Sequence, residues 1–219
     1  MKIAIFYHIG QIGVWVPIYQ SQVHRLYASG LIKEALHIHF GVNGDRELFN
    51  VPSKAIVKTN TDWSSEIGTL FSLKNFCEEN PDYKVLYFHT KGASKGNING
   101  QSWRLMMEYF VIDKWKNCVN YLNEYDCVGP EMNILGSTLW SDGSLTQNDP
   151  TPFFTGNFWW ANASYINTIK RRYLNSQSRL DKEWWIGDGE FGCKSKNLFK
   201  SGCGETCPYE YYFHEEEYV

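Results

Sequence analysis

Three consecutive polar residues whose side chains can bind ligands follow the apolar residues 85–88 directly: His89, Thr90 and Lys91. An apolar run that ends in polar residues predicts a buried strand whose carboxyl end carries an imidazole, a hydroxyl and an ammonium group. Gly92 comes next, and a glycine lets the backbone approach a bound group closely. Lys91 is therefore suited to hold an anion such as a diphosphate. Alternatively, Lys91 is a solvated turn residue and His89 a satisfied buried histidine, and the pattern alone leaves both open.

A second cluster is the stretch FFTGNFWWANASYI, residues 153–166. The rings of Trp159 and Trp160 offer flat apolar faces on which sugars stack, and the amides of Asn157 and Asn162 can bond hydroxyl groups. Consecutive residues of an extended segment point to opposite faces, so we expect one tryptophan in the core and the other at the site. Asn162 also begins a glycosylation triplet, Asn-Ala-Ser, which we expect to be unused in a chain without a secretory signal.

A third cluster, RLDKEWWIGDGEFG, brings Glu183, Asp188 and Glu190 close together in the sequence. A carboxylate can act as the general base that deprotonates a hydroxyl group during its attack. Asp188 is the leading candidate because the glycines beside it suggest a loop that can approach a ligand, and Glu183 is the second. The alternative is that these acids are solvated or paired with Arg179.

The chain contains six cysteines, for which inert core, metal and disulfide are the competing interpretations. The three in apolar surroundings are expected to be buried thiols, namely Cys77, Cys118 and Cys127. The others could surround zinc together with a histidine, although their spacing matches no strong zinc pattern: Cys193, Cys203, Cys207 and His214. A disulfide between Cys203 and Cys207 is a further alternative, against which a reducing compartment argues.

The elements that must position these clusters alternate along the chain. Strands are expected over residues 2–10, 35–45, 55–60 and 84–89, and helices over residues 16–30, 64–80 and 101–125. Alternation of this kind predicts a largely parallel sheet covered by helices. Ligands bind such sheets at the carboxyl ends of the strands, so His89, Thr90 and Lys91 should face the ligand crevice.

Composition limits the classes of protein that fit. The 219 residues are 43% hydrophobic, which is enough to bury the core of a single domain. The net charge is -3, with 21 basic and 24 acidic residues well mixed, so we expect no nucleic-acid partner. The first fifteen residues lack the pattern of a signal peptide, and no segment has the length of a membrane span, so we expect a soluble, cytoplasmic protein.

Several motifs together resemble a known family. They are LYFHTKGAS, WRLMMEYF at 103–110, YDCVG at 125–129, FTGNFWWANASYI and EWWIGD. In this order they are similar to small glycosyltransferases that use nucleotide-diphospho-sugars, found in bacteria and large DNA viruses, and the His-Thr-Lys run resembles that of rhamnan-synthesis proteins. The resemblance covers about residues 60–190. It implies a single α/β domain of the GT-A type, with a mostly parallel central sheet flanked by helices.

The same resemblance implies two substrates and which half of the chain binds each of them. Residues 1–100 would form the half that binds a nucleotide-sugar donor, UDP- or GDP-linked, and residues 101–219 the half that binds a glycan acceptor. In the donor half, His8 and Asn43 would contact the base or ribose and Glu66 would face the same pocket, with a structural role as the alternative for each. His89 and Thr90 would also bind the donor. In the acceptor half, the contacts would come from Asn157 with Trp159 or Trp160.

The chain departs from the family at the metal site. GT-A enzymes of the usual kind carry an Asp-any-Asp motif that holds a divalent metal on the diphosphate, and here His-Thr-Lys stands in its place. The task of that metal is to neutralise the charge of the leaving group, which Lys91 and Arg104 could perform as fixed cations. We therefore expect Mn or Mg to be weakly required or not required, although His89 could still bind Mn.

The sequence leaves the type of activity open in two respects. Inversion and retention are not distinguished, and the assignment of a base applies to inversion alone. A non-catalytic carbohydrate-binding protein of the same fold is the main alternative to an enzyme. A nucleotide-binding oxidoreductase fits poorly, because no G-x-G-x-x-G follows the first strand.

Overall fold

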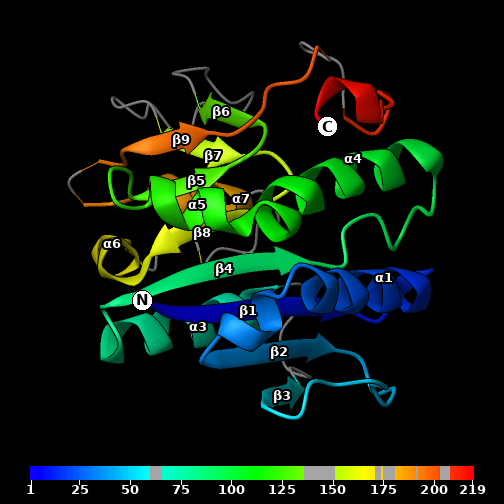
Figure 1. Ribbon diagram of the computed structural model, residues 1–219, viewed down its shortest axis with the longest axis horizontal. Coiled ribbons are helices and arrows are strands. Elements are labelled where there is room, and N and C mark those ends of the chain that lie inside the picture. The colour runs from blue at the N-terminus through cyan, green and yellow to red at the C-terminus, as the bar shows by residue number, and fades with distance from the viewer. Residues whose placement is uncertain (60–65, 136–150, 171–173, 175–180, 191, 203–207) are drawn as a thin grey trace, which may run out of the picture.

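A seven-stranded mixed sheet forms the centre of the protein in a computed structural model (Figure 1). The structure describes the chain apart from residues 60–65, 136–150, 171–173, 175–180, 191 and 203–207. In spatial order the strands are β3 (Ala55–Thr59), β2 (His37–Asn43), β1 (Lys2–Gly10), β4 (Tyr83–His89), β8 (Trp159–Asn162), β5 (Cys127–Gly129) and β9 (Ser195–Asn197). A separate antiparallel pair consists of β6 (Met132–Leu135) and β7 (Thr151–Phe154).

The strand directions confirm the predicted α/β architecture with a mostly parallel sheet. Strands β3, β2, β1 and β4 are parallel to their neighbours, and β5 is parallel to β9. Strand β8 alone of the seven runs antiparallel, against both β4 and β5. Seven consecutive residues of β1, 3–9, are buried, as expected of a central strand that is covered on both faces.

Helices cover both faces of the sheet (Figure 1). They are α1 (Trp15–Ala28), α2 (Leu31–Glu34), α3 (Ile67–Glu79), α4 (Ile98–Glu108), α5 (Trp115–Tyr121), α6 (Ala163–Thr168) and α7 (Asp181–Trp184), with the 3-10 turns η2 (Trp185–Gly187) and η3 (Glu215–Glu217). Residues of α1, α4 and α5 share one apolar core with Ile5 of β1, whereas residues of α3, α6 and α7 share the other with Phe6. The alternation of β1 side chains thus separates two cores.

The order of the strands reverses beside β1. The chain leaves β1 for β2 on one side and later enters β4 on the other, with α1 and α3 packed on opposite faces. Such a reversal is a topological switch point, and the crevice outside the carboxyl ends of the two strands is where open α/β sheets bind ligands. The fold therefore places the ends of β1 and β4 at the expected ligand position.

The single helix expected over 101–125 is interrupted. A π-helical turn, η1 (Tyr109–Asp113), separates α4 from α5. A π turn widens the helix and frees backbone groups for other partners. Trp160 Nε1 uses one of them, donating to the carbonyl of Val111 at 2.8 Å, and the thiol of Cys118 lies 3.2 Å from the carbonyl of Phe110.

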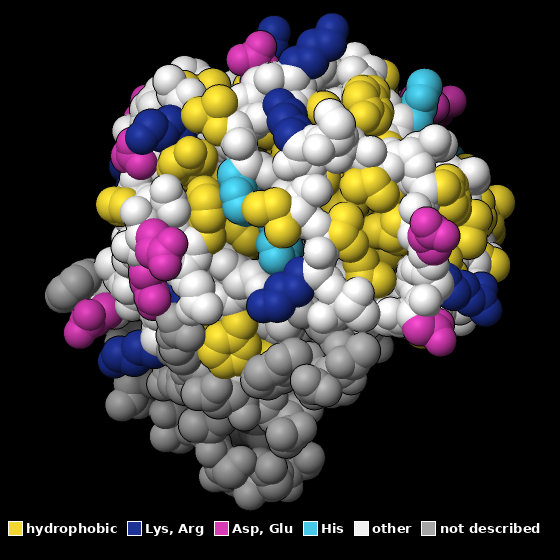
Figure 2. Space-filling view, turned by 90° about the horizontal axis from the view of Figure 1, so that it is seen from below, with side chains coloured by type: hydrophobic (Ala, Val, Ile, Leu, Met, Phe, Trp, Pro, Cys, Tyr) yellow, Lys and Arg dark blue, Asp and Glu magenta, His cyan; other side chains and the backbone are white. Residues whose placement is uncertain are grey.

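The β3 end of the sheet is an exposed edge. Ile56 and Val57 of β3 are about half exposed, and Figure 2 shows hydrophobic side chains on this side among scattered charges of both signs. No basic stripe is visible on the described part of this face. None of the helices in the described part of the chain has both the length and the apolar character that crossing a bilayer requires.

Candidate functional site

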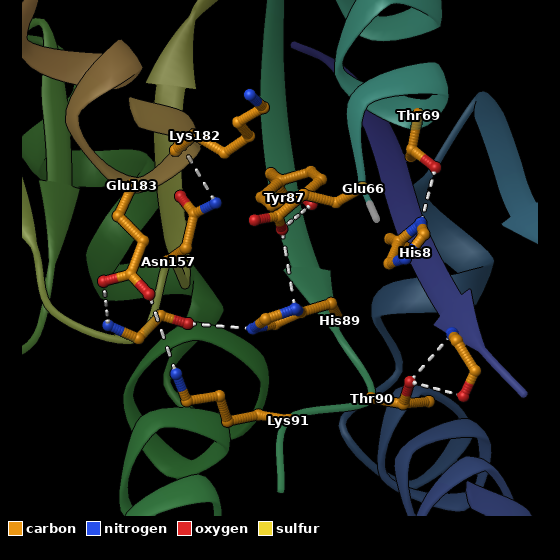
Figure 3. Close-up of polar contacts among 12 residues, drawn as sticks. His8, Glu66, Thr69, Tyr87, His89, Thr90, Lys91, Asn157, Lys182 and Glu183 are labelled. Atoms are coloured by element: carbon orange, nitrogen blue, oxygen red, sulfur yellow. Dashed lines mark hydrogen bonds and ion pairs between the residues drawn. The ribbon is translucent and has the colours of Figure 1, made fainter. Parts of the chain in front are cut away.

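Polar groups from neighbouring strands meet at the switch point. His8 of β1 and His89 of β4 are paired in the register of the two parallel strands. Just beyond them, the amide of Gly10 donates to the hydroxyl of Thr90 at 3.0 Å. Thr90 thus ties together the ends of β1 and β4, and Lys91 follows it in the chain with its side chain directed toward Glu183 (Figure 3).

A cavity of about 240 Å³ opens beside Lys91, between α1 and α4. We call it the α1/α4 cavity; its lining residues are Val14, Pro17, Ile18, Ser21, Lys91, Gly92, Gly96, Asn97, Gln101, Arg104 and Leu105. Two of these residues are cationic, and none of the described lining residues is acidic. The structure therefore brings Lys91 and Arg104, which are both in the predicted donor site, to one cavity.

The loop between β4 and α4 shapes one wall of this cavity. Gly92 has φ +82°, a left-handed conformation that favours glycine. Asn97 caps α4, since its side chain accepts a hydrogen bond from the amide of Gly100 at 3.0 Å. Because the amino end of a helix carries a partial positive charge, the start of α4 adds to the positive potential from the two cations.

Lys91 is held from two sides. Its Nζ lies 4.3 Å from the centre of the Trp103 ring and 5.5 Å from that of Tyr209, in cation-π contacts. It also lies 3.8 Å from Oε1 of Glu183, which approaches from α7 (Figure 3). The lysine is only 4% exposed, so its charge is fixed in position at the wall of the cavity.

Arg104 belongs to a buried charge network behind the cavity. Its Nη1 donates to Oε1 of Glu108 at 2.7 Å, and Arg25 Nε lies 3.7 Å from the other carboxylate oxygen. Burial raises the pKa of Glu108, while Arg104 and Arg25 oppose that rise. Nε of Arg104 has no hydrogen-bond partner within the described part of the chain. This buried donor is a group that a bound anion can satisfy.

Glu183 is oriented by a tight turn. Its Oε2 accepts a hydrogen bond from the amide of Gly156 at 3.3 Å, while Oε1 faces Lys91. Gly156 has φ +99°, and a Cβ added there would lie 2.6 Å from the sulfur of Met107. The positive φ favours glycine, and the missing side chain lets the turn pack closely against α4 beside Glu183.

A second polar cluster lies on the other face of the sheet, against α3 (Figure 3). His8 Nδ1 is 3.0 Å from the hydroxyl of Thr69, and burial lowers the pKa of His8 to about 4. Glu66 accepts a hydrogen bond from the hydroxyl of Tyr87 and lies 3.5 Å from Nδ1 of His89. His8 and Glu66 thus have partners inside the protein, which is a structural role; their contacts with a nucleotide stay a prediction.

The side chains at the end of β4 do not suit a divalent metal as its ligands. The Thr90 hydroxyl is engaged with Gly10, and His89 Nε2 lies 3.0 Å from the carbonyl oxygen of Gly156. Lys91 is itself a cation. Within the described residues no group of three histidine, cysteine or acidic side chains could hold a metal ion.

The predicted acceptor contacts need correction. Trp159 and Trp160 are both fully buried, on opposite faces of β8 as expected, because helices cover the sheet on each side. Neither ring is open to a sugar. Asn157 is also buried; its amide oxygen accepts from Trp159 Nε1 at 2.7 Å and its amide nitrogen donates to the carbonyl of Lys182 at 3.3 Å. This asparagine shapes the turn that carries Gly156.

The structure places one of the two candidate bases beside Lys91. Asp188 follows η2, next to Gly189, which forms a bridge with Ile169 near α6. Glu183 is the carboxylate that the structure brings to Lys91. The alternative partner Arg179 lies outside the described residues.

Two asparagines have defined backbone contacts. Asn43 ends β2 opposite Gly10, so it lies at the same edge of the sheet, and its carbonyl accepts from the amide of Gln11 at 2.9 Å. The side chain of Asn162 donates to the carbonyls of Leu122 and Tyr125, at 2.9 and 3.0 Å. Asn162 thereby ties β8 to the segment before β5.

Sequence reasoning missed two aromatic contacts of Lys91. Trp103 lies beside Arg104 in the motif WRLMMEYF, on the helix that follows Lys91 in the sequence. That position could have indicated its contact with the lysine. Tyr209 comes from the carboxyl-terminal segment, and nothing in the local sequence indicates its contact with the lysine. Gln22 was also missed: it accepts a hydrogen bond from the Tyr7 hydroxyl and donates to the carbonyl of His89.

The expectation for the apolar cysteines is confirmed. Cys77, Cys118 and Cys127 are buried and free. Cys193 is also a free thiol, and it lies against Cys127. The zinc and disulfide hypotheses depend on Cys203 and Cys207, which lie outside the described residues.

Comparison with known proteins identifies the family. The profile of the family described as "Domain of unknown function (DUF8361)" matches residues 35–177, which is more than half of the chain. The chain belongs to this family. No curated protein matches it. Among solved structures it is similar to the bifunctional IspDF from Campylobacter jejuni, with 10% identity and a TM-score of 0.47, over 90% of this chain and 50% of that one. The chain thus spans about half the length of that protein.

Proposed function

We propose that this DUF8361 protein is a glycosyltransferase that moves a hexosyl or deoxyhexosyl group from a nucleoside-diphosphate sugar to a glycan acceptor. One observation carries the proposal: Lys91 and Arg104 line a single cavity beside the carboxyl end of β4, with no acidic residue among its described lining. A cavity of this charge suits a diphosphate, and its place at the switch point suits a nucleotide. The motif resemblance supports the same substrate class.

In this proposal the two cations act on the leaving group. Breaking the bond between sugar and diphosphate increases negative charge on the diphosphate, and fixed positive charges stabilise that change. Lys91 is held in place by Trp103 and Glu183, and Arg104 by Glu108, so little reorganisation accompanies the reaction. No step is assigned to a metal, because the donor groups at the end of β4 do not suit one.

Glu183 is the proposed general base for an inverting transfer. Its side chain is 15% exposed, and its carboxylate lies 3.8 Å from Lys91, so it borders the proposed donor site. It would accept the proton of the acceptor hydroxyl as that oxygen attacks the sugar. The amide of Gly156 fixes one carboxylate oxygen and leaves the orientation of the other to Lys91.

The first experiment measures donor binding by thermal shift and calorimetry with UDP-, GDP-, dTDP- and CDP-sugars, each with Mn and with EDTA. Lys91→Met keeps the length of the side chain and removes its charge. Lys95→Met is the matched control, because Lys95 lies on the same loop, over the Tyr209 ring at 4.1 Å, and is not among the lining residues of the cavity.

The proposal expects one nucleotide class to bind in EDTA and to lose about 10- to 100-fold in affinity in Lys91→Met, which is the usual worth of a charged hydrogen bond. Lys95→Met should bind like the wild type. Equal losses in both variants, or binding that requires Mn, would contradict the role of Lys91. Binding without donor hydrolysis or transfer would favour the carbohydrate-binding alternative. That alternative was expected to use an aromatic surface, and both tryptophans are buried.

A further inference from the structure

Two thiols from distant parts of the chain lie in contact at the far end of the sheet. The sulfur of Cys127, in β5, is 3.2 Å from the sulfur of Cys193, which lies just before β9. Cys127 is buried and Cys193 is partly exposed. No other pair of cysteines is in contact among the described residues.

The backbone around the pair is firmly aligned. Asp126 donates its amide to the carbonyl of Lys194 at 2.8 Å, and the amide of Lys194 donates to the Asp126 carboxylate at 2.8 Å. Strands β5 and β9 are then paired in parallel, with Cys127 opposite Ser195. Because these bonds fix both chain segments, the sulfurs are kept near each other. A disulfide bond needs a sulfur separation of about 2.0 Å, so they must approach by only about 1 Å.

We propose that Cys127 and Cys193 form a reversible oxidation site, which a low-molecular-weight disulfide such as oxidised glutathione converts to a disulfide bond. The Cys193 thiolate attacks oxidised glutathione and releases one glutathione thiolate. Cys127 then gives its proton to the released glutathione thiolate, and its sulfur attacks that of Cys193 and releases the second thiolate, which takes a proton from solvent. Two protein thiols are oxidised, and one glutathione disulfide is reduced to two glutathione molecules.

The surroundings assign the order of attack. Cys193 is the more exposed residue of the two, so we assign the mixed disulfide to it. Cys127 is 1% exposed and burial raises its pKa, so it acts as the resolving thiol inside the protein. The resulting bond joins β5 to the segment that leads into β9, a three-residue edge strand whose neighbour in the sheet is β5. Oxidation should therefore stabilise this edge.

The test incubates the full chain over a range of glutathione redox ratios, blocks free thiols by alkylation, and maps disulfides by mass spectrometry without reduction. The proposal expects a peptide that links Cys127 to Cys193, and a rise of about 5 °C or more in melting temperature that dithiothreitol reverses. The control variant Cys77→Ser should behave like the wild type, since Cys77 is a buried free thiol elsewhere. Cys193→Ser should show neither the link nor the shift.

Other results would overturn the proposal. They are glutathione retained on Cys193 with Cys127 reduced, a link from Cys193 to Cys203 or Cys207, and alkylation of both thiols at every ratio. The same reaction in urea separates native geometry from chance pairing: the linked fraction should fall at least about tenfold there, and an equal fraction would refute the argument from the fold. The peptide map of the wild type decides the matter even if a variant folds poorly.

Discussion

Removing Arg104 tests the charge network behind the α1/α4 cavity. In Arg104→Met the apolar chain length is kept, but Glu108 loses the partner that donates to it at 2.7 Å. Glu108 is fully buried, and Arg25 stays 3.7 Å away as its second cation. The variant therefore contains a buried carboxylate that is incompletely compensated.

The expected loss follows from that burial. Removing one partner of a buried ion pair costs about 3 to 5 kcal/mol in the free energy of unfolding. Because Arg25 stays beside Glu108, we expect a loss of about 3 kcal/mol. For a chain of this size each kcal/mol lowers the melting temperature by about 2 to 4 °C, so the variant should melt about 6 to 12 °C below the wild type. Urea denaturation gives the change in the free energy of unfolding directly.

A double variant separates the lost ion pair from lost packing. Arg104→Met with Glu108→Leu replaces both charges by apolar groups, and Arg25 keeps its contact with Asp113 at 3.0 Å. It should recover most of the loss, because a buried ion pair can be exchanged for apolar side chains at little cost. A loss below about 1 kcal/mol in the single variant, or a double variant as unstable as the single one, would refute the network.

The pH dependence gives an independent check. Burial already raises the pKa of Glu108 above the ordinary value of 4.5, and removing Arg104 raises it further. The folded variant then holds a proton that the unfolded chain has released, so its stability falls as pH rises above that ordinary value. The deficit of Arg104→Met should be smaller at about pH 5 than at about pH 7.5.

Three further predictions concern single side chains. Glu183→Gln should lower the rate of transfer by about 10²- to 10⁴-fold, a larger factor than its change in donor affinity, as measured by steady-state kinetics and calorimetry, whereas Asp188→Asn should have a smaller effect on the rate. His8 has its pKa lowered to about 4 from 6.5, so the unfolded chain takes up a proton first and stability should fall by up to about 3 kcal/mol as pH drops through this window; His8→Gln should remove that share in urea titrations. Asn157→Ala should cost about 2 kcal/mol, because it leaves Trp159 Nε1 unpaired and puts alanine at φ +59°; Asn157→Gly, which tolerates that φ, should lose less in the same assay.

The parts of the fold that could be predicted are those that local sequence determines. The apolar run before His89 is a strand in the sheet interior, and the alternation of strands and helices gives the mostly parallel sheet with its ligand edge. The contacts that could not be predicted join segments that are far apart in the sequence. Both tryptophans of β8 are buried because α5 and α6 lie on opposite faces of the sheet, and no local pattern reports that coverage.

The same distinction applies to the site. Lys91 and Arg104 could be grouped from their motifs, and the cavity contains both. Choosing Glu183 over Asp188 required the turn at Gly156, whose φ and close packing on Met107 are not visible in the residue types alone. The break between α4 and α5 was missed because the hydrogen bond that uses its freed carbonyl, from Trp160 to Val111, joins segments far apart in the sequence.

In the proposed function, the pairing of each cation with a carboxylate bears on how the site would bind a diphosphate without a metal. Glu183 holds Lys91 and Glu108 holds Arg104, yet neither acid is among the residues that line the α1/α4 cavity. The carboxylates therefore offset the cost of burying the cations, while the side of each cation that meets the cavity remains positive. A divalent metal in the same place would be repelled by both cations. In the proposed reaction, fixed charges from the chain itself then perform the neutralisation of the diphosphate.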